Sequence, residues 1–240
     1  MLLQTLSYIP LLLQAPLRDG GEAYTETDLS RLIVEPWNGT SAAFFLLIVG
    51  YWALKLRGQY REHLFMSICV PILAIGGIGG TIYHAFRLHQ FFLLMDWLPI
   101  MILCLSASVY FFIKVFERWV PAVLLVLTVL VSQVMMFQTE VFSPQFATNL
   151  NYSVMALLIL IPTALLLWKT RFYAGKWIGY GLGTFVIALT CRMLDPLALL
   201  PMGTHFLWHT FGALACHSLF MYVYQINLRP KAVGKKGIRV

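Results

Sequence analysis

Residues 64–86 read LFMSICVPILAIGGIGGTIYHAF, an apolar run without a single lysine, arginine, aspartate or glutamate. A helix that crosses a bilayer needs about 20 mostly apolar residues. Within lipid, only helices and closed barrels satisfy the hydrogen bonds of the backbone, and a run this long and continuous favours a helix. The stretch therefore predicts a transmembrane helix.

Six further runs have the same character, at residues 40–56, 91–113, 120–137, 152–168, 177–194 and 205–226. The composition agrees, since 60% of the residues are hydrophobic and 11% are charged, whereas soluble domains carry about 25% charged residues. We therefore predict an all-α, polytopic membrane protein with a seven-helix bundle at residues 40–226. Residues 1–39 are expected to form an extracytoplasmic segment with an interfacial helix near its start, and residues 227–240 a basic cytoplasmic tail.

The basic residues predict the orientation. Of the 17 lysines and arginines, 13 lie in the C-terminal tail or in the loops that follow the first, third and fifth runs. The positive-inside rule places these loops and the tail in the cytoplasm and the N-terminus outside, which requires an odd number of spans. The net charge of +7 is thus explained by topology, and no nucleic-acid partner is expected.

Ionisable residues within spans are costly, so each one is a candidate functional residue. His84 lies near the end of the second run, Asp96 near the start of the third, and His205 and His209 at the start of the seventh. The predicted orientation places all four residues at the same depth, near the outer face.

His205 and His209 are spaced i, i+4, so both rings leave one face of a helix. With His84 they would complete a set of three histidines, which in catalytic zinc sites leaves a fourth position open. Zinc lowers the pKa of a bound water to about 7 and polarises carbonyl groups. Asp96 would act as a general base or would orient a ligand. Binding of one metal ion requires the ring of His84 within roughly 8 Å of the other two. The alternative for a lone histidine pair is hydrogen bonding between helices.

Three further histidines fit this site less well. His63 lies in a basic loop and is expected to be solvated. His89 lies in the short outer loop and is a reserve ligand. His217 would lie about 18 Å deeper than His205 and is expected to contact a neighbouring helix. The glycine-rich run at residues 76–80 predicts close helix packing.

Three motifs resemble the alkaline ceramidase family, in particular its bacterial branch. This family belongs to the wider CREST membrane-hydrolase superfamily, which includes the progestin and adipoQ receptors. RMLDP at 192–196 followed by PMGTHFLWH at 201–209 is similar to the closing motif of that branch. MDWLP at 95–99 following His84, and EPWN at 35–38, are similar to two earlier segments.

The resemblance implies seven helices around a pocket that opens to the membrane, with zinc on His84, His205 and His209 and with Asp96 beside the zinc-bound water. It implies a lipid substrate such as ceramide, cleaved to a fatty acid and a sphingoid base. We accordingly expect a bacterial inner-membrane protein with its active site near the periplasmic face.

The sequence departs from the family in two respects. Where the family has a serine four residues before the helix-two histidine, this chain has Gly80, and we predict that Thr81 replaces that serine as a catalytic residue. Animal relatives also bind calcium through an acidic N-terminal segment that includes the glutamate matched by Glu35. The nearby acidic residues here do not reproduce that spacing, so a calcium site and a solvated acidic segment both remain open.

Two local structural roles are also predicted. Asn38 is a candidate N-cap for the first membrane helix. Arg192 and Asp195, three residues apart, are expected to form an ion pair.

The function predicted from these motifs is zinc-dependent hydrolysis of a lipid amide bond. The main alternative is a non-enzymatic seven-helix lipid receptor with a structural zinc ion. A transporter is less favoured, because the inner halves of the predicted spans offer almost no polar residues. The sequence fixes neither the lipid headgroup nor the oligomeric state.

Overall fold

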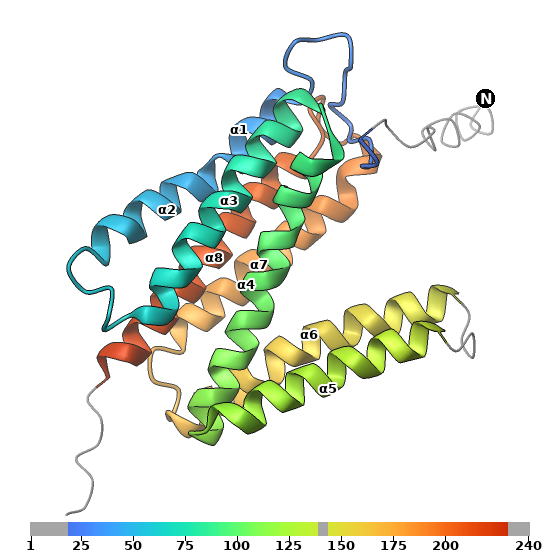
Figure 1. Cartoon of the computed structure of the whole chain (residues 1–240). Coiled ribbons are helices and arrows are strands. Elements are labelled where there is room, and N and C mark those ends of the chain that lie inside the picture. Colours follow the sequence, from blue (N-terminus) through green and yellow to red (C-terminus); the bar gives the residue numbers. More distant parts are fainter. Residues whose placement is uncertain (1–18, 139–143, 230–240) are drawn as a thin grey trace, which may run out of the picture. The chain divides into compact units, whose positions relative to one another are not determined.

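A computed structural model describes residues 19–138 and 144–229, and within these ranges all regular secondary structure is helical (Figure 1). The predicted all-α fold class is thus confirmed for the described residues. The expected interfacial helix near the N-terminus and residues 230–240 of the predicted tail lie outside them. The elements are α1 (Pro36–Ala42), α2 (Phe44–Lys55), α3 (Leu64–Phe86), α4 (Gln90–Phe116), α5 (Trp119–Gln138), α6 (Pro144–Lys169), α7 (Lys176–Leu194), the 3-10 turn η2 (Asp195–Leu197) and α8 (His205–Leu228).

Each of the seven predicted runs is helical, and α3 has the predicted bounds. Four helical stretches are long and apolar enough to cross a membrane: 36–55, 64–86, 90–116 and 176–197. The apolar stretches at 119–133 and 153–169 are shorter. α8, which carries His205, His209 and His217, is not among the four. The structure therefore has the character of an integral membrane protein, and the seven-span topology stays a prediction.

The start of the first membrane stretch differs from the prediction. α1 begins at Pro36 with Glu35 at the N-cap position, so Asn38 lies inside the helix and the predicted N-cap role of Asn38 is wrong. Proline suits the first helical position because its missing N–H would have no partner there. The carboxylate of Glu26 accepts the backbone N–H groups of Trp37 (3.0 Å) and Asn38 (2.6 Å), which the helix start leaves without intrahelical acceptors.

The chain divides into two compact units, residues 1–99 with 176–240, and residues 100–175, so that α4 crosses the boundary at Pro99. In the first unit α7 and α8 pack along each other, and α1 and α2 both contact α3 and α8 (Figure 1). This unit contains four of the predicted site residues, His84, Asp96, His205 and His209.

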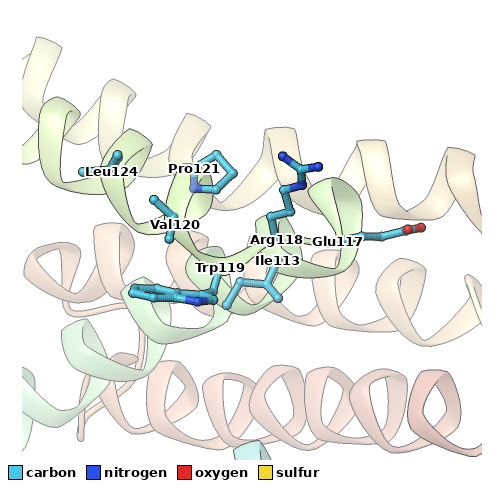
Figure 2. A pocket seen from close by; sticks show the side chains of 7 residues that line it. All are labelled: Ile113, Glu117, Arg118, Trp119, Val120, Pro121 and Leu124. Carbon is cyan, nitrogen blue, oxygen red and sulfur yellow. The ribbon is translucent and has the colours of Figure 1, made fainter.

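The second unit has its own apolar core and one described hollow. Phe112, Ala122, Val126 and Leu158 form the buried core. A hollow of about 700 Å³ lies at the turn between α4 and α5, and Figure 2 shows the side chains that line it. It is lined by Ile113, Glu117, Arg118, Trp119, Val120, Pro121 and Leu124. None of these residues belongs to the predicted site.

The glycine-rich part of α3 permits the close packing that its sequence predicts. A Cβ at Gly77 would come within 2.7 Å of the Leu46 side chain on α2. A Cβ at Gly79 would come within 2.9 Å of the carbonyl oxygen of Met95 on α4. Such distances are inside van der Waals contact. At Gly79 the obstructing atoms include the backbone of Met95, so α3 approaches α4 this closely only with glycine at that position.

The prediction for His63, which lies at the other end of α3 from His84, is corrected by the structure. This residue precedes α3 and is only 2% exposed, so the expectation of a solvated side chain is wrong. Its ring stacks on Tyr224 of α8, with centroids 4.7 Å apart. Burial lowers the pKa of His63, which favours the neutral ring. His217 contacts the rings of Tyr51 and Trp52 on α2, in agreement with its predicted contact to a neighbouring helix.

A pair of glycine substitutions tests this packing. Gly79→Ala is expected to lower the free energy of unfolding by about 1–3 kcal/mol, because the new methyl group has no space beside Met95. Gly183→Ala in α7 is the matched control, because a Cβ there meets no atom within 4 Å among the described residues. Alanine has the higher helix propensity, so this control should be neutral or stabilising by up to about 1 kcal/mol. Thermal unfolding in detergent measures both, and equal effects would contradict the packing argument.

Candidate metal centre

Three histidines from α3 and α8, two helices far apart in the sequence, meet in the first unit. The ring centroids of His84 and His209 lie 4.7 Å apart, those of His205 and His209 4.7 Å, and those of His84 and His205 5.4 Å. All three residues are buried, and one nitrogen from each lies within 4.8 Å of the others. The predicted convergence within roughly 8 Å is confirmed, and the group is able to hold a metal ion.

Asp195 fixes the start of α8, where two of these histidines lie. Its Oδ1 accepts the backbone N–H groups of Thr204 (2.6 Å) and His205 (2.9 Å), two of the donors that a helix start leaves free. Gly203 precedes them with φ of +69°, a conformation that glycine adopts readily. The local turn therefore sets the direction in which His205 enters the site.

The ion pair predicted between Arg192 and Asp195 does not form between these two described side chains. The carboxylate of Asp195 is used by the backbone of Thr204, His205 and Thr25 instead. The guanidinium of Arg192 lies 5.3 Å from the ring centroid of Trp208. The prediction was wrong because helix capping competes with the ion pair for the same oxygens.

Hydrogen bonds fix the tautomers of two of the rings. His84 Nδ1 lies 2.5 Å from Glu35 Oε2, and a carboxylate oxygen accepts the proton of that nitrogen. His209 Nδ1 lies 3.1 Å from the carbonyl oxygen of Asn38, which can only accept. In both neutral rings the lone pair is therefore on Nε2. His84 Nε2 is buried without a hydrogen-bond partner among the described residues. Its lone pair is therefore free to coordinate a metal ion.

Glu35 contacts the histidine group, whereas the sequence connected it only with a calcium site. One carboxylate oxygen bonds His84, and the other accepts from Thr27 (2.6 Å) and Arg87 (2.5 Å). Burial raises the pKa of Glu35, but the hydrogen bond to His84 and the charge of Arg87 outweigh it and hold that pKa below its usual value. A carboxylate that orients a metal-binding histidine raises the basicity of the ring. The EPWN motif pointed to Glu35, but nothing in the sequence predicted its contact with His84.

Asp96 lies beside the histidine group, as predicted. Its Oδ2 is 3.9 Å from His84 Nε2, and its side chain is 25% exposed. Gly80 makes this position possible, because a Cβ there would clash with Asp96 Oδ1. A serine at this position would require the Asp96 side chain to move.

Thr81 lies one residue further along α3. Its hydroxyl donates to the carbonyl oxygen of Gly77 at 2.6 Å, a bond within the helix. The Thr81 hydroxyl can donate to another acceptor only if its hydrogen bond to the Gly77 carbonyl breaks.

His89, the reserve ligand, is exposed and does not belong to the histidine group found among the described residues. Its Nδ1 accepts the backbone N–H of Phe91 at 3.0 Å, close to the start of α4.

Residues 19–35, which we call the N-terminal strap, contact the metal centre. The ring of Tyr24 stacks on His205 with centroids 3.8 Å apart and lies 5.4 Å from the ring of His84. The backbone and hydroxyl of Thr25 donate to Asp195 at 3.0 Å and 2.5 Å. The predictions assigned no role to Tyr24, since a single aromatic residue in a loop carries no periodic signal.

A comparison with known protein families matches no family, and a comparison with curated proteins finds no matching sequence.

Substitution of Glu35 tests the carboxylate–histidine contact. Glu35→Gln should weaken metal binding about 10- to 100-fold, because an amide is a poorer acceptor for the His84 proton. Glu26→Gln is the matched control, since Glu26 bonds only backbone N–H groups in the described contacts and no histidine. Competition with a chromogenic chelator measures both affinities. A Glu35→Gln protein with unchanged affinity would show that the contact does not tune the metal site.

Proposed function

We propose that this protein is a zinc-dependent membrane hydrolase that cleaves the amide bond of a lipid such as ceramide to give a fatty acid and a sphingoid base. One observation carries the proposal. A buried group of three histidines lies beside a carboxylate, Asp96, that is not itself part of the ligand group. Three ligands with an adjacent acid–base group are the arrangement of a catalytic rather than a structural metal site.

The donor set fits zinc. Imidazole nitrogens suit zinc, and three of them leave a position for water or substrate. His84 and His209 present Nε2, since their Nδ1 atoms are hydrogen-bonded elsewhere. When bound, zinc would supply a Lewis acid that polarises the carbonyl oxygen and activates water.

The side chains perform the proton transfers. Asp96 takes a proton from the attacking water as the oxygen of that water bonds the carbonyl carbon. The same carboxyl then returns that proton to the amine nitrogen as the carbon–nitrogen bond breaks. Glu35 keeps the His84 ring in place throughout through its bond to Nδ1.

Apolar side chains near Asp96 support a lipid substrate. Leu94 and Trp97 of α4 are 40% and 46% exposed, and Ile78 of α3 is 45% exposed. In the proposed topology of seven spans, with the N-terminus outside, these side chains face lipid near the outer leaflet. A lipid would then enter sideways, with its amide group next to Asp96.

The alternative is a seven-helix lipid receptor in which zinc is structural. Asp96 favours the enzyme, because its carboxylate has no hydrogen-bond donor in the described part of the chain and is partly exposed. A carboxylate with a purely structural role is expected to be fully hydrogen-bonded.

Asp96→Asn distinguishes the two functions. The variant should retain its metal and lose turnover of a fluorescent ceramide by about 10²- to 10⁴-fold, since the amide cannot transfer a proton. His209→Ala is the comparison and should lose both metal and turnover. A wild-type protein with bound metal that hydrolyses no acyl-amide lipid would favour the receptor, and an Asp96→Asn protein with full activity would refute the role of Asp96.

A second substitution tests Thr81 as the proposed replacement for the family's serine. Thr81→Val should lower kcat about 10²-fold, the usual effect of removing one donor to a developing oxyanion. Thr184→Val in α7 is the matched control, because the Thr184 hydroxyl also donates to a carbonyl four residues back, that of Tyr180. Equal kinetics for the two variants would remove Thr81 from the mechanism.

A further inference from the structure

The guanidinium of Arg87 occupies an oxygen-lined position between the N-terminal strap and the metal centre. Its Nε and Nη2 donate to the two carboxylate oxygens of Asp19, at 2.6 Å and 3.0 Å. Its Nη1 donates to the carbonyl oxygen of Glu22 at 2.9 Å and to Glu35 Oε1 at 2.5 Å. The side chain is buried, with the ring of Tyr83 4.6 Å away. One cation therefore bonds four oxygens from three residues of the strap.

This cation is connected to the metal centre through a single residue. Glu35 receives Arg87 on Oε1 and His84 on Oε2. Asp19, Arg87, Glu35 and His84 thus form one chain of charge-assisted hydrogen bonds, which are stronger and more directional than neutral ones. Loss of the Arg87 side chain would therefore affect the position of His84 through the carboxylate of Glu35.

The backbone of Arg87 adopts a conformation that is more usual for glycine. Arg87 terminates α3 in the left-handed region, with φ of +50°. Glycine is the usual residue at such a position, because other residues are strained there. Here an arginine takes this position, and its side chain makes the contacts with Asp19, Glu22 and Glu35 described above.

A calcium site, left open by the sequence, does not fit these residues. Calcium takes six to eight oxygen ligands, but Asp19 and Glu35 already pair with Arg87. Glu26 caps α1, and Asp28 bonds Ser30 and Arg31. Among the described residues, only the three histidines form a group that could hold a metal.

We propose that Arg87 is a built-in cation that takes the place of calcium. Its fixed charge holds the N-terminal strap against the metal centre and positions Glu35 on His84, so the folded protein needs no calcium. Arg87 is thus a positioning residue. The inference rests on these contacts and does not require the proposed hydrolytic reaction.

Arg87→Gly tests the proposal, because glycine keeps the left-handed helix end and removes only the side chain. We expect the unfolding temperature of the purified protein, with zinc held constant in calcium-free buffer, to fall by roughly 10 °C, since two buried carboxylates lose their partner. Millimolar calcium should restore part of this loss, because the vacated oxygens are calcium ligands. Magnesium, which demands stricter geometry, should restore less.

Two controls accompany this variant. Arg87→Lys keeps the charge and should retain more stability than the glycine variant. Arg31→Gly removes an arginine of the same strap whose ion pair with Asp28 is exposed, and should change the unfolding temperature little.

The wild-type protein provides a test that does not depend on any variant folding. Its unfolding temperature and zinc affinity should not respond to added calcium. A calcium-stabilised wild-type protein would overturn the proposal. So would an Arg87→Gly protein that is as stable as wild type, or one that gains nothing from calcium.

Discussion

The structure of the site depends on one hydrogen bond, between Nδ1 of His84 and the carboxylate of Glu35. It joins the end of α3 to the residue that precedes α1, and it sets which nitrogen of His84 faces the other two rings. Because both side chains are fully buried, the bond is not weakened by competition with water. The strap, α1 and His84 on α3 are therefore fixed with respect to one another.

The α8 side of the site is fixed in the same manner by Asp195. Its carboxylate caps the helix that carries His205 and His209, and it also bonds the strap at Thr25. The strap is thus attached to both ligand-bearing helices, and Tyr24 lies between these two attachments on the ring of His205. Two buried carboxylates, Glu35 and Asp195, support three imidazoles, and a third carboxylate, Asp96, lies beside them without a hydrogen-bond donor among the described residues.

The sequence predicted the helices and the ligand set because both rest on strong local constraints. An apolar run such as 64–86 has one stable conformation in lipid, and polar residues within such runs are too costly to be incidental. The i, i+4 spacing and the common depth then assigned His84, His205 and His209 to one site. The supporting contacts were not predictable, because Glu35 and His84 are 49 residues apart and Thr25 and Asp195 are 170 apart. Such pairs leave no periodic pattern, and His63 was misplaced for the same reason: its covering partner Tyr224 lies on α8.

X-ray absorption spectroscopy of the purified, metal-loaded protein tests the central claim most directly. We expect about one zinc ion per chain, with three imidazole nitrogens at about 2.0 Å, one further light ligand and no sulfur. A protein that binds no metal, or a spectrum dominated by thiolate ligands or by oxygen ligands alone, would contradict it.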